Sequence, residues 1–226
     1  MNIKIIGLGG IGSILSDQIC RFANYSINDF KVKITLIDGD EYEHKNNERQ
    51  TFNSFGSKAD VKQYELSSKF SKLTISSIPN YIDSNNISTI LSDGDLILMG
   101  VDNHKTRKIV SDYCTTLDSV TLISGGNDYT DGNVQIYHRR EGKDLTPDLC
   151  AYHPEIDNPR DKLPTEMSCE ELSKSEPQLL FTNLTAATLM CQAFYNVGIR
   201  DEVKYCESYF DILTMKADSK IRKVKN

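Results

Sequence analysis

The sequence predicts an α/β fold with a doubly wound, Rossmann-like, mostly parallel sheet, a long crossing loop, and a C-terminal helix plus edge strands. Short, continuously apolar runs alternate with segments of helical spacing, as they do in parallel sheets that are covered on both faces. Glycines in the spacing G-x-G-x-x-G follow the first apolar run. The length of 226 residues suits one domain of this class.

The first five expected strands are β-branched or wholly apolar runs that suit parallel pairing, and a sixth is expected to be antiparallel. In chain order these strands are Ile3–Gly7, Lys31–Asp38, Lys72–Ile78, Asp95–Asp102, Ser119–Gly126 and Gly132–Arg139. Helical spacing between and after them predicts helices at Gly9–Tyr25, Ala59–Phe70, Asn86–Ser92, Lys105–Leu117 and Gln178–Tyr195. The tail Val203–Val224 alternates weakly, and we expect two edge strands from it.

The region 140–177 differs from the rest because it contains five of the six prolines and little periodicity. Loops of this length in compact domains are usually functional or disordered. We therefore expect one domain, 1–226, made of a nucleotide-binding core (1–139), a crossing loop with a candidate cysteine (140–177), and a C-terminal helix with strands (178–226).

The glycine motif predicts a phosphate-binding loop. Gly7, Gly9 and Gly12 stand between a strand and a helix, so the backbone can approach a phosphate at the helix N-terminus, and Gly10 lies in the same loop. Asp38 ends the next strand, where a ribose-binding acid is expected. NAD, FAD and ATP binders share these features, so the glycines leave the nucleotide open.

The stretch "LIDGDEYEHKNNERQTF" places more polar groups beside this loop than a ribose requires. Its candidate ligand-binding residues are Asp40, Asn47, Arg49 and Gln50. The guanidinium of Arg49 suits phosphate oxygens, and either Lys58 or Lys62 on the following helix could add a second cation.

The fourth strand ends at the same crevice, at Asp102, with Asn103 beside it. Acids together with cations around one pocket suit a magnesium nucleoside triphosphate, with Asp102 as the Mg²⁺ ligand. Hydride transfer with NAD would give this cationic charge no role.

Composition excludes several classes. The net charge of −6 argues against a nucleic-acid surface. No apolar run of about 18 residues suggests a membrane span, and the chain enters a strand at once, so we expect no signal peptide. The six cysteines form no C-x-x-C pair, which favours reduced thiols in a cytoplasmic protein.

The combination resembles the ThiF-type adenylyltransferases, a superfamily that includes the ubiquitin-activating enzymes and the activators of sulfur carriers. The residues that carry this resemblance are "IIGLGGIGS", "LIDGDEYEHKNNERQTF", "GSKADV", "LMGVDNHKTRKIVSDYC" and "MSCEELSKSEPQLLFTNLTAATLM". They span most of the chain. The D-x-D…N-x-x-R-Q pattern is only partly regular, because two asparagines precede Arg49.

The resemblance implies that ATP and Mg²⁺ adenylate the C-terminal glycine carboxylate of a small ubiquitin-like or sulfur-carrier protein, releasing pyrophosphate. Carried over by position, Gly9 and Gly12 hold phosphate, Asp38 or Asp40 holds the ribose, and Asp102 helps bind Mg²⁺. Arg49 and Lys58 are then the residues that stabilise charge on the α-phosphate. Arg107 matches the helix after "VDN", where a structural role and a role near the acyl group both stay open.

Cysteines distinguish variants within this family. Cys169 falls where the family often has a reactive cysteine that can take the acyl group as a thioester, although neighbouring acids oppose thiolate formation and a helix N-terminus would favour it. Cys150 lies where many relatives have one of two zinc-binding C-x-x-C pairs. Here Pro147 stands at the first position, so we expect no structural zinc. Cys20, Cys114 and Cys191 read as core thiols, and the four histidines as surface or loop residues.

The expected assembly is a homodimer or heteromer, with the helix Gln178–Tyr195 and strand edges as the interface. Many family members begin with an additional helix that lends an arginine to the neighbouring subunit. This chain begins on its first strand, so we expect that the arginine is either absent or supplied by another segment or protein. Three alternatives remain: a non-catalytic subunit that binds a partner, an NAD-dependent oxidoreductase, and ATP chemistry on a small carboxylate such as that of a modified tRNA base.

Overall fold

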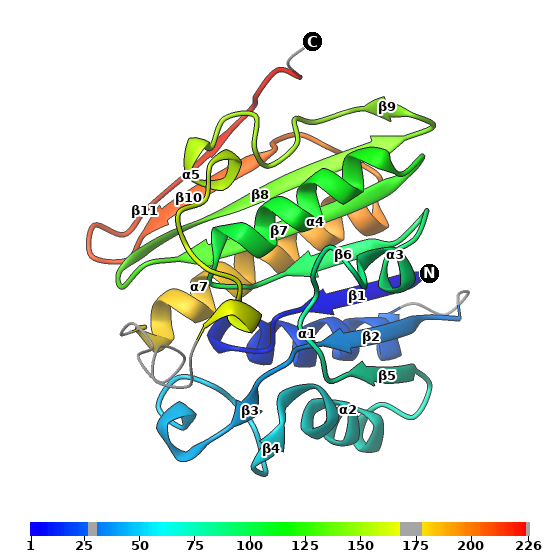
Figure 1. Cartoon of the computed structure of the whole chain (residues 1–226), viewed down its shortest axis with the longest axis vertical. Coiled ribbons are helices and arrows are strands. Elements are labelled where there is room, and N and C mark those ends of the chain that lie inside the picture. The colour runs from blue at the N-terminus through cyan, green and yellow to red at the C-terminus, as the bar shows by residue number, and fades with distance from the viewer. Residues whose placement is uncertain (27–30, 168–177, 225–226) are drawn as a thin grey trace.

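The computed structural model describes residues 1–26, 31–167 and 178–224. Over these residues the chain forms an α/β fold around one mixed sheet (Figure 1). The neighbouring strands run in the order β11-β10-β8-β7-β6-β1-β2-β5. Pairing is parallel from β7 through β6, β1 and β2 to β5, and antiparallel from β7 through β8 and β10 to β11. The predicted Rossmann-like, mostly parallel sheet is confirmed.

The strands of this sheet are β1 (Asn2–Ile6), β2 (Lys33–Ile37), β5 (Thr74–Ile78), β6 (Leu96–Met99), β7 (Val120–Asn127), β8 (Asp131–Arg140), β9 (Lys143–Asp144), β10 (Glu207–Asp211) and β11 (Lys216–Lys220). All six expected strands are present, each within a few residues of its expected ends. The sixth is antiparallel to its neighbour as expected. The tail supplies the two strands β10 and β11 at one edge of the sheet.

The longer helices are α1 (Gly10–Ser26), α2 (Lys58–Lys69), α4 (His104–Thr116) and α7 (Leu180–Ala193). Two of them begin where a polar side chain caps the first turn. Ser57 Oγ accepts from the Asp60 N–H at 3.3 Å, and Asn103 Oδ1 accepts from the Thr106 N–H at 2.8 Å. The expected helix Gln178–Tyr195 begins later and continues into a π-helical segment, η3 (Phe194–Ile199).

Two apolar cores lie on opposite faces of the sheet. One contains Leu15 of α1, Leu66 of α2 and Ala187 of α7. The other contains Val110 of α4 and side chains of the one-turn helices α3 (Ile87–Ile90) and α5 (Pro154–Asp157). Figure 1 shows this division of the helices between the faces. Both faces of the central strands are therefore buried, as their continuous apolar sequence indicated.

Short elements occupy two segments that the sequence left as loops. The polar loop after β2 contains the hairpin β3 (Glu41–Tyr42) and β4 (Gly56–Ser57), with the 3₁₀ turn η1 (His44–Asn46) between them. The described part of the crossing loop contains β9, α5 and η2 (Pro164–Glu166). These elements are too short to show a periodicity in the sequence.

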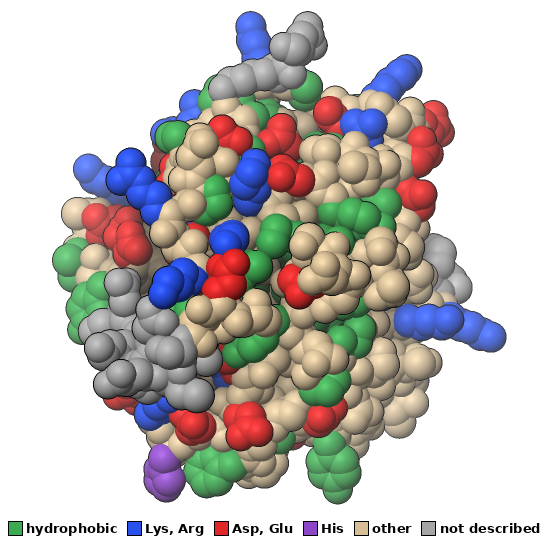
Figure 2. Space-filling view, in the orientation of Figure 1, with side chains coloured by type: hydrophobic (Ala, Val, Ile, Leu, Met, Phe, Trp, Pro, Cys, Tyr) green, Lys and Arg blue, Asp and Glu red, His purple; other side chains and the backbone are tan. Residues whose placement is uncertain are grey.

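The face that carries α4 and α5 has acidic and basic side chains interspersed over its surface (Figure 2). This mixture contrasts with the single-sign field that a nucleic-acid-binding face presents. Within the described parts of the chain, no helix has both the length and the apolarity needed to cross a membrane.

Candidate nucleotide-binding site

The glycine loop connects the end of β1 to α1 and needs glycine at two positions for different reasons. Gly7 has φ of +84°, in the left-handed region that side chains disfavour. A Cβ on Gly12 would lie 1.8 Å from the Gly7 carbonyl oxygen, so only glycine allows α1 to pack this closely against the loop. The tight turn and the helix that begins at Gly10 leave the first-turn N–H groups of α1 available to a phosphate.

Asp38 ties this loop to the end of β2. Its carboxylate accepts hydrogen bonds from the Leu8 N–H at 2.5 Å and the Asp40 N–H at 2.8 Å. Burial raises the pKa of Asp38 to about 6, and the nearby ammonium of Lys58 acts in the opposite direction. Each carboxylate oxygen keeps a further lone pair, so Asp38 can also accept from a ribose hydroxyl.

Asp40, Lys58 and Tyr81 form a connected polar group beside the loop. Lys58 Nζ lies 3.0 Å from Asp40 Oδ2, and the Tyr81 hydroxyl donates to the other carboxylate oxygen. The Lys58 N–H also donates to the Asp40 carbonyl at 2.9 Å, which fixes the start of α2 against the polar loop. The Lys58 side chain is 8% exposed and that of Asp40 is 43% exposed. The pair therefore combines a partly exposed carboxylate with a buried ammonium.

Tyr81 was missed by sequence reasoning. It follows β5 in an irregular segment, where no spacing relates it to Asp40. The structure shows its place through Gly39, because a Cβ there would lie 2.6 Å from the Tyr81 ring, a tertiary contact that the sequence does not reveal. Burial and the Asp40 carboxylate raise the Tyr81 pKa, so the hydroxyl stays a donor.

The structure places the two candidate lysines in different surroundings. Lys62 is 2% exposed, and its Nζ lies 3.0 Å from the equally buried carboxylate of Glu65. That carboxylate also accepts from the Asn53 backbone N–H. Lys58, and not Lys62, belongs to the polar group beside the glycine loop.

The remaining residues of the polar loop differ in burial. Arg49 is 7% exposed. The Gln50 side chain lies beside the glycine loop, with Nε2 3.9 Å from where a Gly9 Cβ would be, and its buried Oε1 has no partner among the described residues. Asn47 is exposed and lies 3.3 Å from the His44 ring nitrogen, whereas the neighbouring Asn46 is buried and holds the η1 turn. The candidate role of Asn47 stays a prediction, and the sequence alone does not reveal this difference in burial between the two asparagines.

Two candidate residues, Asp102 and Asn103, follow the end of β6, and they differ in their surroundings. Asp102 is exposed, and its charge acts on both Tyr81 and Arg107, so it lies near the Asp40–Lys58–Tyr81 group. Asn103 caps α4, so part of its side chain has a structural role.

Arg107 holds the ends of two strands together from inside the protein. Its Nη2 donates to the Val101 and Gly125 carbonyls at 2.6 and 2.9 Å. Burial lowers its pKa to about 10. Of the two roles that the sequence left open for Arg107, these contacts support the structural one.

The candidate nucleophile, Cys169, lies outside the described residues. Cys20 and Cys114 are fully buried core thiols as expected, while Cys191 is half-buried. Cys150 is half-buried, and burial raises its pKa to about 12. No group of three or more potential metal ligands occurs among the residues that the structure describes.

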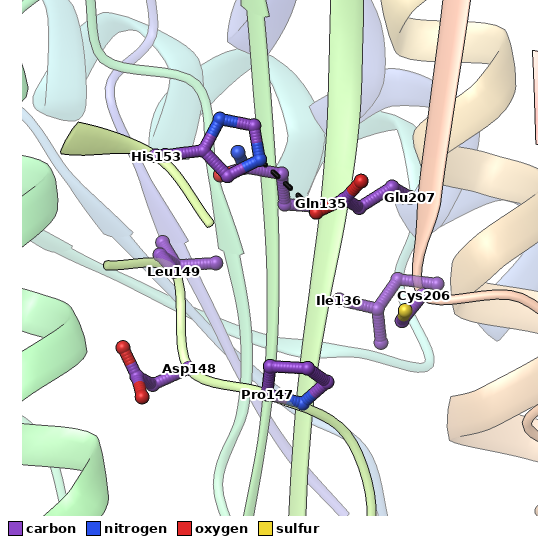
Figure 3. Close-up of a pocket in the computed structure, with 8 residues that line it drawn as sticks. All are labelled: Gln135, Ile136, Pro147, Asp148, Leu149, His153, Cys206 and Glu207. Atoms are coloured by element: carbon purple, nitrogen blue, oxygen red, sulfur yellow. Dashed lines mark hydrogen bonds and ion pairs between the residues drawn. The ribbon is translucent and has the colours of Figure 1, made fainter. Parts of the chain in front are cut away.

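Two histidines are buried, and the first of them corrects the expectation of surface or loop positions, whereas the second lies in the crossing loop as expected. His138 lies on β8, is 5% exposed, and contacts Thr121 Oγ1 at 2.9 Å. His153 is 7% exposed and joins Glu155 to Glu207, at 3.0 and 3.1 Å. It lines a small cavity between β8, the crossing loop and β10, together with Gln135 and Cys206 (Figure 3). His153 contacts Glu207 of β10 and His138 contacts Thr121 of β7, and local sequence reveals neither contact.

Comparison with known proteins agrees with this fold. The model of the ThiF family matches residues 1–225. The adenylyltransferase and sulfurtransferase MOCS3 of Drosophila virilis is 30% identical over 139 residues, a match that covers 60% of this chain and 29% of that protein. The MOCS3 of Culex quinquefasciatus is 26% identical over 145 residues, or 62% of this chain and 31% of that protein. The matched region is thus under a third of either relative.

Solved structures give the same fold at lower identity. Escherichia coli MccB with AMPCPP and MccA is similar with a TM-score of 0.75 and 20% identity, covering 99% of this chain and 64% of that chain. PaaA is similar with a TM-score of 0.71 and 15% identity, covering 97% of this chain and 63% of that chain. Because the family model spans nearly the whole sequence, the chain belongs to the ThiF family.

Proposed function

We propose that this chain binds ATP with Mg²⁺ and adenylates the C-terminal glycine carboxylate of a small ubiquitin-like or sulfur-carrier protein. The observation that carries the proposal is the Asp40–Lys58–Tyr81 group, which sets a held ammonium beside a glycine loop of phosphate-binding geometry. Membership of the ThiF family supports the same chemistry. Relatives named adenylyltransferase, and MccB crystallised with ATP, support the nucleotide.

In the proposed reaction a carboxylate oxygen attacks the α-phosphorus of ATP, and the bond to pyrophosphate breaks. The glycine loop and the first turn of α1 bind phosphate oxygens, and Asp38 or Asp40 accepts from the ribose. Lys58 and Arg49 stabilise the negative charge that develops on the α-phosphate, as expected for a reaction driven by positioning and charge neutralisation. A thioester at Cys169 would follow if that thiol attacks the adenylate and displaces AMP.

Asp102 fits the requirement for magnesium. Mg²⁺ at nucleotide sites is usually held by one or two carboxylates together with phosphate oxygens, and Asp102 is an exposed carboxylate at the crevice. The ion would supply charge neutralisation on the phosphates when bound. This arrangement requires no preformed cluster of protein ligands.

Calorimetric titration with ATP plus Mg²⁺, with ATP plus EDTA, and separately with NAD tests this function. We expect heat from ATP and none from NAD. Asp102→Ala should weaken binding of ATP with Mg²⁺ by about ten-fold, as loss of one charged contact does, and leave binding with EDTA unchanged. Asp112→Ala is the matched control, because Asp112 is an exposed carboxylate on α4, the helix that follows Asp102 in the chain. Binding of NAD in place of ATP would overturn the proposal, and binding of neither would favour a non-catalytic subunit.

We also propose that this chain forms a homodimer. Helix α7 has no charged residue in its sequence LFTNLTAATLMCQA, and Phe181 and Leu184 on it are 63% and 46% exposed. Phe22, Cys191 and Tyr195 line a hollow beside them. An uncharged, apolar helix face suits a two-fold, self-complementary contact. Light scattering should give a dimer that Leu184→Glu dissociates, and a monomer at high concentration would contradict the dimer.

A further inference from the structure

Asn183 of α7 is a buried polar side chain whose hydrogen-bonding capacity is not used. It is 0% exposed. Neither its Oδ1 nor its Nδ2 has a hydrogen-bond partner among the described residues. A buried amide without a partner is uncommon in folded proteins and costs stability, so it calls for a reason.

The position of this amide is at the phosphate loop. A Cβ built on Gly10 would lie 2.1 Å from Asn183 Nδ2 and 2.8 Å from Oδ1, so the amide packs directly on the first residue of α1. The absence of a side chain at Gly10 therefore makes room for Asn183. Helices α1 and α7 lie on the same face of the sheet (Figure 1), which brings the two residues together across 173 positions of sequence.

The rest of this contact is ordered. The adjacent Thr182 is also fully buried, and its Oγ1 donates to the Tyr129 carbonyl at 2.7 Å. Ala186 and Ala187 on the next turn are buried in the same core. The residues next to Asn183 are therefore buried, and Thr182 makes its hydrogen bond, whereas the Asn183 amide makes none to the described residues. Loose packing at the start of α7 does not account for it.

We propose that Asn183 is a nucleotide-binding residue, whose Nδ2 donates a hydrogen bond to the polyphosphate of the nucleotide bound at the first turn of α1. The inference rests on the proposed function and adds to it a ligand from the C-terminal helix. Both ends of the amide lie within 2.8 Å of where a Gly10 Cβ would be, so its NH₂ group packs at the first residue of the anion-binding turn. Anions gather at that turn because its N–H groups have no acceptor within the helix.

This role predicts opposite effects on stability and on binding. Asn183→Leu keeps the approximate size of the side chain and removes an unsatisfied buried amide, so its urea midpoint should stay the same or rise. ATP affinity should fall by about ten-fold, as expected for one hydrogen bond to a charged group. Adenosine affinity should not change, because adenosine has no phosphate.

Gln135→Leu provides the matched control. Gln135 is 3% exposed and its Oε1 and Nε2 also have no partner among the described residues, but it lies on β8 beside the cavity of Figure 3. The same chemical change there should leave the urea midpoint equal or higher and ATP affinity unchanged. Calorimetry with ATP and with adenosine, together with urea unfolding, gives all the readouts.

Equal ATP affinity of Asn183→Leu and wild type would overturn the inference, as would equal losses for ATP and adenosine. If leucine prevents folding, Asn183→Ala replaces it, since alanine only removes atoms, and the same comparison decides. If wild type itself does not bind ATP, the proposed function fails first. If wild type binds ATP and the variant binds it equally well, only the role of Asn183 fails.

Discussion

Two lysines near the start of α2 form ion pairs that differ in the exposure of the partner carboxylate. Lys58 pairs with Asp40, whose side chain is 43% exposed at the crevice. Lys62 pairs with Glu65, and these two side chains are 2% and 5% exposed. The first pair can exchange its partner for a ligand phosphate, whereas the second is closed off from any ligand. Both lysines are buried, so the exposure of the partner carboxylate is what separates the candidate binding residue, Lys58, from the structural one.

Breaking the closed pair should give the largest effect on stability. Lys62→Met leaves Glu65 as a buried carboxylate without its cation, which typically costs about 3–5 kcal/mol of unfolding free energy. Urea unfolding measures this loss. Adding Glu65→Gln to Lys62→Met should recover part of it, because the uncompensated charge is then removed. A stability equal to wild type in the single variant would show that the pair is not the structural element described.

Breaking the open pair should instead act on catalysis. Lys58→Met should slow pyrophosphate release from ATP by about 10²–10³-fold, the usual effect of removing one preorganised group that stabilises developing charge. The assay uses a peptide ending in Gly-Gly as the probe carboxylate. The unfolding free energy should change by less than about 1 kcal/mol, since the Lys58–Asp40 pair is partly exposed. If Lys62→Met slows the reaction as much as Lys58→Met does, the contrast between the pairs is wrong.

The pH dependence of stability tests another buried charged group, Asp38, whose pKa burial raises while the neighbouring Lys58 acts to lower it. Its pKa is 3.8 when unconstrained and about 6 in the folded protein, so folding favours the protonated form. The stability that this group contributes is therefore present below about pH 4 and is lost as the pH rises through about 6. The shift corresponds to about 2–3 kcal/mol. Asp38→Asn should remove this part of the slope in unfolding free energy between pH 4 and 6.

The control for this measurement is the same urea series on Asp60→Asn, because Asp60 lies on the exposed side of α2. That variant should keep the wild-type slope. An identical slope for wild type and Asp38→Asn would mean that the Asp38 carboxyl titrates normally in the folded protein.

Much of the fold was predictable because its signals are local. The apolar runs and the glycine spacing predicted the parallel strands and the loop before α1, and both are present. The hairpin β3–β4 was not predicted, since a two-residue strand carries no measurable periodicity. The buried positions of His138 and His153 were also missed, because each depends on contacts with segments far along the chain.

Within the candidate site, the residue types and their approximate location were predictable, but their individual surroundings were not. The spacing in "GSKADVKQ" allows either lysine to approach a phosphate. Asn46 and Asn47 are equivalent in the sequence pattern, yet only one is buried. Tyr81 and Asn183 carry no local signal that relates them to a nucleotide.

By itself, the sequence determined the α/β sheet, the phosphate loop and the family resemblance, because hydrophobic periodicity and glycine spacing act over a few residues. Only the tertiary structure decided that Lys58 pairs with Asp40 and Lys62 with Glu65, that Tyr81 completes the Asp40 group, and that Asn183 packs on Gly10. These outcomes depend on helix packing and strand order, which join residues that lie far apart in the chain.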